Sequence, residues 1–246
     1  MKREYSFLES RTLKGIIFVI PIVLISIVFL IKIVSGIDDP FYKNLTKEDG
    51  VIENATVFVY LFSFIFSLSI AKQFKSKKIL FTLFLILGIG FFVIAFEEIS
   101  WGQRMFDFES PDWFPENIQD ETNIHNLVVF QSYRNTAYVV VAFMGAFSWI
   151  IFPLIKRIVK NVGKNYEIFL EYALPSKFLF SYFFSVLIFK LTMKHLPREF
   201  IDGHISLDFF INYDSEFFEL ILAFGIMLFV FHTFVKLRMS KKNLVV

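Results

Sequence analysis

The sequence predicts an all-α membrane protein, a bundle of about six transmembrane helices with an ordered interfacial or re-entrant outer loop between spans three and four. Of its 246 residues 56% are hydrophobic and 36 are Phe, and its mean hydropathy of +0.60 exceeds that of an ordinary soluble domain. Apolar runs near the roughly 20 residues that cross a bilayer as a helix recur along the chain. We see no repeat or linker, so residues 1–246 are expected to form one domain.

The first three spans are predicted at 15–34, 55–71 and 79–96. The first exceeds the roughly 7–15 apolar residues of a signal peptide and lacks an A-x-A site, so we expect it to be retained. Pro21 is expected near its start, where a first-turn proline is tolerated. The second span ends in the basic tract KQFKSKK, which predicts a short turn before the third.

The last three spans are predicted at 136–154, 178–193 and 217–235. The fifth is the weakest prediction because it is short and contains Lys190. A lysine near a helix end can extend its ammonium to the interface, and we expect Lys190 to do so.

The orientation follows from the basic residues of alternate loops. Seventeen Lys and Arg residues lie in 1–14, 72–78, 156–177 and 236–246, against seven in 37–54, 97–135 and 190–214. We therefore expect a multi-pass protein of the cell (inner) membrane. The positive-inside rule places both of its termini in the cytoplasm.

Acidic residues segregate the other way, although they played no part in that orientation. Nineteen of the 23 Asp and Glu residues fall in the outer segments, counting the start of the sixth span. The net charge of +2 gives no basic domain for nucleic acid, so membrane lipids are the expected partners. The absence of Cys excludes disulfides and thiolate chemistry.

The motif EEISWGQR, residues 97–104, follows the third span directly. If the helix continues through it, Glu97, Trp101 and Arg104 share one face and Glu98 points elsewhere. Acids at a helix C-terminus oppose the helix dipole, which favours a functional role. The alternative is a solvated helix end with Trp101 as an interface anchor.

The segment ENIQDETNIHN, residues 116–126, concentrates carboxylates, carboxamides and one imidazole. On a helix, Asn117, Glu121 and His125 would form one stripe, and Gln119 and Asn123 a second. Glu-x3-His can chelate a divalent metal or hold a carboxylate against imidazole. The alternative is a loop in which Thr122 or Asn123 caps the next helix.

Two further groups lie at outer helix starts. In YDSEFFEL, Asp214 or Ser215 is expected to cap the sixth span with Glu216 in its first turn, whereas Glu219 lies deeper and indicates function. In TKEDGVIEN, residues 46–54, Thr46 and Asp49 resemble a capping box, and Glu53 lies one turn further in.

The orientation puts all four groups on one side, so Glu53, Glu98, Glu121, His125 and Glu219 could converge in one outward-facing pocket. Oxygen ligands with one imidazole suit Zn, Mn, Mg or Ca, and we predict metal ligands at Glu98, Glu121, His125 and Glu219. The candidate catalytic residues are Glu97, Glu98, Arg104, Asn117, Gln119, Glu121 and His125.

EEISWGQR followed by N-x-Q-x-E-x-N-x-H-N resembles a group of bacterial multi-pass membrane proteins of uncharacterised function, over roughly residues 48–126. The resemblance implies a site without implying a reaction. We expect a metal-dependent hydrolase or transferase acting on a lipid or lipid-linked substrate from the outer leaflet. The alternatives are an ion-coupled transporter and a non-catalytic subunit of a membrane complex.

Overall fold

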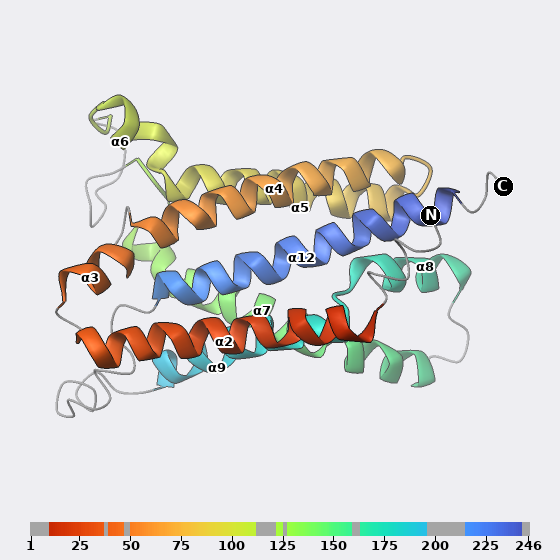
Figure 1. Cartoon of the computed structure of the whole chain (residues 1–246). Helices are drawn as coiled ribbons and strands as arrows, with labels where there is room; N and C mark the ends of the chain where they lie inside the picture. Colours follow the sequence, from red (N-terminus) through yellow and green to blue (C-terminus); the bar gives the residue numbers. More distant parts are fainter. Residues whose placement is uncertain are drawn as a thin grey trace.

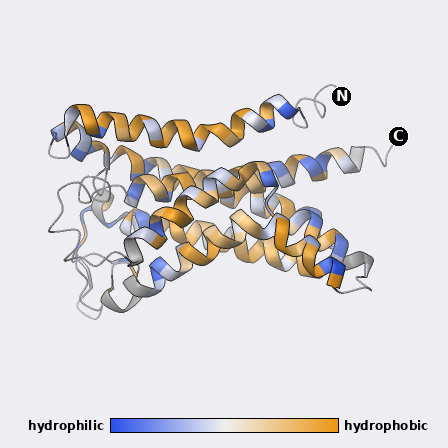
Figure 2. Cartoon of the chain, turned by 90° about the horizontal axis from the view of Figure 1, so that it is seen from below, coloured by the Kyte–Doolittle hydropathy of each residue, from blue (hydrophilic) through white to orange (hydrophobic). Residues whose placement is uncertain are grey.

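The chain folds into a bundle of long helices. The computed structural model describes residues 10–36, 39–46, 50–111, 122–124, 127–158, 163–195 and 215–242. Within these ranges the regular elements are all helices, and six segments are long and apolar enough to cross a membrane. This confirms the all-α multi-pass fold. Figure 2 shows the expected pattern, with apolar middles and hydrophilic helix ends.

The helices alternate in direction between two ends of the bundle. The long ones are α2 (Arg11–Ser35), α4 (Val51–Gln73), α5 (Lys78–Glu98), α7 (Val128–Ile158), α9 (Phe180–His195) and α12 (Ser215–Lys242). We call the end where α4, α7 and α12 begin the carboxylate end, and the opposite end the basic end. The described chain starts and finishes at the basic end (Figure 1).

Within the described ranges, five short elements connect the long helices. Three lie at the carboxylate end: α3 (Pro40–Thr46), η1 (Ser100–Gly102) and α6 (Gln103–Phe106). Two lie at the basic end, α8 (Lys164–Ala173) and η2 (Lys177–Leu179), in a stretch where the sequence predicted only a loop. The segment over 166–192, which joins α8, η2 and α9, supplies the fifth span.

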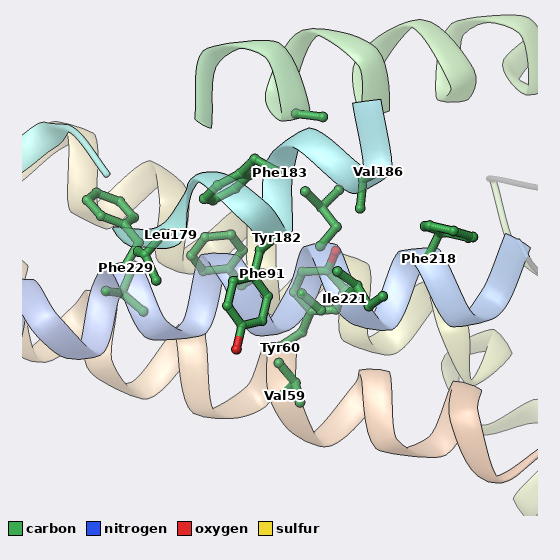
Figure 3. Packing of buried hydrophobic residues seen from close by; sticks show 14 of the residues in the cluster. Val59, Tyr60, Phe91, Leu179, Tyr182, Phe183, Val186, Phe218, Ile221 and Phe229 are labelled. Carbon is green, nitrogen blue, oxygen red and sulfur yellow. The ribbon is translucent and has the colours of Figure 1, made fainter. Parts of the chain in front are cut away.

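Helix α12 is the centre of the bundle. It packs against α4 on one side and α9 on the other, while α5 packs on α4 and both α7 and α2 pack on α9 (Figure 1). Side chains from α4, α5 and α9 surround α12 in the core (Figure 3). Phe189 of α9 and Phe218 of α12 stack with ring centroids 3.9 Å apart. Such aromatic pairs account for part of the Phe-rich composition.

Glycines allow α9 to approach two neighbouring helices closely. A Cβ atom added to Gly145 of α7 would lie 2.2 Å from Cδ1 of Phe183, and one added to Gly225 of α12 would lie 2.8 Å from Cβ of Tyr182. Ala142 and Ala146 flank Gly145 and are fully buried. Small residues at a membrane helix interface bring backbones together, so α9 lies in close contact with α7 at Gly145 and with α12 at Gly225.

Helix α2 lies at the edge of the bundle, and its attachment involves a proline. Because α2 begins at Arg11, Pro21 lies in the helix interior, and the expected first-turn position is wrong. An interior proline removes a backbone hydrogen bond. The Ser181 hydroxyl of α9 donates to the Phe18 carbonyl oxygen of α2 at 2.6 Å, in the turn before Pro21. This bond ties α9 to α2 next to the Ile17 carbonyl, which is the one that Pro21 leaves without its backbone donor.

The start of α4 differs from the sequence prediction. Thr46 ends α3 and donates its hydroxyl to the Tyr42 carbonyl oxygen at 2.9 Å, so it does not cap α4. The N-cap of α4 is Gly50, without a side-chain cap. Asp49 lies outside the described residues. Helix α3 instead covers Lys32, which is fully buried with its ammonium 5.6 Å from the centroid of the Tyr42 ring.

Candidate functional site

A buried ion pair lies near the carboxylate end. The ammonium of Lys190 on α9 is 2.8 Å from Oε1 of Glu219 on α12, and their side chains are only 4% and 6% exposed. The expectation that Lys190 extends to the interface is therefore wrong. A buried carboxylate on the neighbouring helix offers the ammonium a partner inside the bundle, which compensates part of its lost hydration.

The Glu219 carboxylate is hydrogen-bonded on both oxygens. The Tyr138 hydroxyl of α7 donates to Oε2 at 2.6 Å, and the Ser215 hydroxyl donates to Oε1 at 3.0 Å. Lys190 also donates to Ser215 Oγ at 3.0 Å, and its ammonium lies 4.4 Å from the centroid of the Tyr138 ring. Glu219 therefore joins α7, α9 and α12 through charge-assisted contacts.

Glu98 lies beside this ion pair. The charges of Glu219, Glu216, Glu53 and Arg134 all act on its carboxylate. These side chains come from α12, α4 and α7, so charges from three other helices act on the last residue of α5. We call the following set the carboxylate cluster: Glu53, Glu98, Glu216 and Glu219 with Arg134 and Lys190.

Two groups of the carboxylate cluster have unused hydrogen-bonding capacity. Nε of Arg134 is buried and has no hydrogen-bond partner among the described residues. The half-buried Glu98 carboxylate also accepts no hydrogen bond from any residue in the described ranges. Leaving a buried guanidinium donor unpaired is unfavourable, so this part of the cluster is suited to a polar ligand.

Helix α5 does not continue through EEISWGQR, as the sequence had suggested. It ends at Glu98, and Ser100, Trp101 and Gly102 follow with φ of 47°, 55° and 83°. Three successive residues in the left-handed region turn the chain sharply. The Trp101 indole nevertheless returns to Glu97 and donates to Oε1 at 2.6 Å.

The turn holds a later segment of the chain in place. Oε2 of Glu97 accepts the Ile124 amide at 2.6 Å, and the buried Asn123 donates its carboxamide to Ser100 Oγ at 2.9 Å. Gln103 accepts the Thr122 amide through Oε1 at 2.6 Å. The carboxylate of Glu97 is thus used by structural contacts. We call these contacts the Glu97 clamp.

The Glu97 clamp also changes the interpretation of ENIQDETNIHN. Thr122 to Ile124 are not helical, and α7 begins only at Val128, so neither Thr122 nor Asn123 lies at its N-cap. Both contact EEISWGQR instead. The described part of the second motif, residues 122–124, therefore packs against the first.

Several predicted site residues lie outside what the structure describes. They are Asn117, Gln119, Glu121 and His125, together with the side chain of Arg104, whose backbone belongs to α6. Of the remaining candidates, the structure brings Glu53, Glu98 and Glu219 together and places Glu97 in the clamp.

No three His, Cys, Asp or Glu side chains within the described ranges are arranged to hold a metal ion. Lys190, Ser215 and Tyr138 already contact both oxygens of Glu219, and a metal would have to displace them. With Glu121 and His125 outside the described residues, the metal prediction stays a prediction.

Three contributors to the carboxylate cluster and its hydrogen bonds were not predicted from the sequence: Arg134, Tyr138 and the inward-facing Lys190. A signal existed for Lys190, since a charged residue inside a predicted span usually faces a polar partner within the bundle. Comparison with protein-family models, curated proteins and solved structures found no match for this chain. The carboxylate cluster is therefore the basis for a functional proposal.

Proposed function

We propose that the protein is a membrane-embedded hydrolase or transferase that acts on a phosphate-bearing lipid or lipid-linked substrate at the carboxylate end. The observation that carries the proposal is the buried Nε of Arg134, which has no hydrogen-bond partner among the described residues and whose positive charge acts on the carboxylate of Glu98. From the distribution of Lys and Arg, we propose that this end faces the extracytoplasmic side.

Each group has a chemical role in this proposal. Arg134 binds a phosphate oxygen of the substrate, since a guanidinium donates well-directed bonds to phosphate. Glu98 accepts the proton of an attacking water or hydroxyl as its oxygen bonds to phosphorus. The leaving-group oxygen takes the electrons of the broken P–O bond and is then protonated from solvent.

The ion pair of Lys190 and Glu219 supports the surroundings of these groups. Lys190 holds Glu219, and Tyr138 holds the other oxygen of Glu219, so α7 and α12 are held together beside Glu98. Rigid support of this kind keeps reacting groups in place. We assign Glu219 and Lys190 as positioning residues, distinct from the catalytic Glu98.

The proposal is tested by substituting Glu98 in the full chain. The protein is reconstituted in vesicles of phosphatidylglycerol, phosphatidylethanolamine and a polyprenyl phosphate, and lipid masses and released phosphate are followed. Glu98→Gln is expected to slow turnover by about 100-fold or more, the usual range for loss of a general base. Glu109→Gln is the matched control, because Glu109 is exposed at the same end.

Two outcomes would contradict the enzyme proposal. One is wild-type protein that leaves every lipid mass unchanged, and the other is a Glu98→Gln variant as active as the Glu109→Gln control. Elemental analysis of wild-type protein and Glu98→Gln tests the metal prediction separately. A stoichiometric metal lost in Glu98→Gln alone would support it.

The second candidate is an ion-coupled carrier, and the charge balance of the carboxylate cluster favours it. Among the described residues the cluster gathers four carboxylates and two basic side chains, and carboxylates inside a membrane commonly bind protons or cations. In proteoliposomes with an internal pH dye, a carrier would move protons in response to a Na⁺ gradient. That flux would be lost in Glu98→Gln, with no change in lipid masses.

A further inference from the structure

A groove lies at the basic end, away from the carboxylate cluster. It measures about 690 Å³ and runs between the turn that joins α4 to α5 and the start of α8. A volume of this order suits a small-molecule ligand. Its lining residues are Ser76, Lys77, Lys78, Ile79, Leu80, Gly163, Tyr166 and Phe169.

The polar part of the groove is basic. Lys77 and Lys78 are exposed and form no ion pair within the described part of the chain. The acidic residues of α8 have other partners, since Glu167 pairs with Lys156 and Glu171 pairs with Lys236 at 3.0 Å. The two lysines that line the groove are therefore free to meet an anion.

The backbone reinforces this charge. Lys77 is the N-cap of α5 and Gly163 is the N-cap of α8, and neither helix receives a side-chain cap. The first amides of a helix are free donors that favour negative charge. Both helix starts border the same groove, so their donors supplement the lysine ammonium groups.

The other part of the groove is apolar. Ile79 is 72% exposed, and the rings of Tyr166 and Phe169 stack with centroids 6.3 Å apart. A free phosphate ion would gain nothing from this apolar surface. A ligand with a phosphate at one end and hydrocarbon at the other would use both parts.

We propose that this groove binds an anionic phospholipid of the leaflet that the basic end faces. The lipid phosphate lies between Lys77, Lys78 and the two helix starts, and its acyl chains lie against Ile79 and Phe169. This assignment concerns the basic end alone and stands independently of the function proposed for the carboxylate cluster.

The test measures lipid binding to the purified full chain. Native mass spectrometry in detergent follows titration with phosphatidylglycerol and with phosphatidylcholine. We expect tighter binding of phosphatidylglycerol, and a loss of about 10- to 30-fold in the double variant Lys77→Gln/Lys78→Gln, since each lysine near a membrane contributes roughly a factor of five in affinity.

The matched control is Lys72→Gln/Lys75→Gln. It removes the same charge from the same tract at exposed residues that do not line the groove. We expect this control to bind phosphatidylglycerol as wild type does. Phe169→Ala is expected to weaken lipid binding while leaving any effect of inorganic phosphate unchanged.

Three results would overturn the proposal. The first is equal binding of both lipids by wild type, and the second is an equal loss in the two double variants. The third is displacement of phosphatidylglycerol by millimolar inorganic phosphate, which would indicate a site for the free anion. Circular dichroism of each variant establishes that a loss of binding does not reflect unfolding.

Discussion

Two ion pairs of the same chemistry lie at opposite ends of the bundle. Lys190 and Glu219 meet between α9 and α12 with side chains 4% and 6% exposed. Lys156 and Glu167 meet at the basic end with side chains 51% and 48% exposed. The buried pair is surrounded by Tyr138 and Ser215, which bond to the same carboxylate.

The two pairs differ in what surrounds the remaining charge when one partner is removed. At the basic end water can solvate the remaining charge, so an exposed pair adds little to stability. Inside the bundle the remaining charge would stay largely buried and would lose its nearest opposite charge. The buried pair therefore specifies how α9 and α12 meet, whereas the exposed pair does not.

The largest effect is expected for Lys190→Met, which leaves Glu219 buried without its cation. We expect a loss of about 3–5 kcal/mol in the free energy of unfolding, the usual range for a broken buried pair. It is measured by circular dichroism during SDS titration of mixed micelles. Lys190→Met/Glu219→Gln should recover much of the loss. A double variant no more stable than Lys190→Met would show that lost packing, and not the uncompensated charge, causes the effect.

An intermediate effect is expected for Tyr138→Phe, which removes the hydroxyl that donates to Oε2 of Glu219. A hydrogen bond to a charged group contributes roughly 1.5–3 kcal/mol, and the unfolding free energy should fall by about that amount. Tyr133→Phe is the control on the same helix, because Tyr133 is 67% exposed. Equal effects of the two substitutions would argue against a special role of the Glu219 bond.

The smallest effect is expected for Lys156→Met. Its partner Glu167 lies in water, so the same SDS titration should show no measurable change, at low or high salt. A loss of stability comparable with that of Lys190→Met would remove the distinction between the two pairs.

The six spans could be predicted because the length and hydropathy of each one are properties of its own residues. Apolar runs of bilayer length gave the six segments, although α7 begins at Val128, eight residues before the predicted start at 136. The residues that meet across helices could not be predicted in the same way. Lys190 appeared as a charge near a helix end, and its partner Glu219 lies on a different helix.

Local geometry was harder still at EEISWGQR. A helical extension explained the spacing of Glu97 and Trp101, and the two side chains do meet. They meet across a left-handed turn at Ser100 and Trp101. Serine and tryptophan rarely adopt positive φ, so the residue types alone do not predict this turn. Hydrogen bonds of Glu97 with Ile124 and of Ser100 with Asn123 stabilise the left-handed conformation of the turn.

The edge position of α2 has a consequence for synthesis and insertion. Its main partner, α9, emerges from the ribosome only after α4, α5 and α7 have been made, so α2 must wait in the lipid as a solitary helix. Among the six candidate spans it is the most apolar, which stabilises it in lipid before α9 is made. The segment over 166–192 is the least apolar and carries Lys190. It enters the bilayer before its Glu219 partner exists, so its stable insertion depends on the arrival of α12.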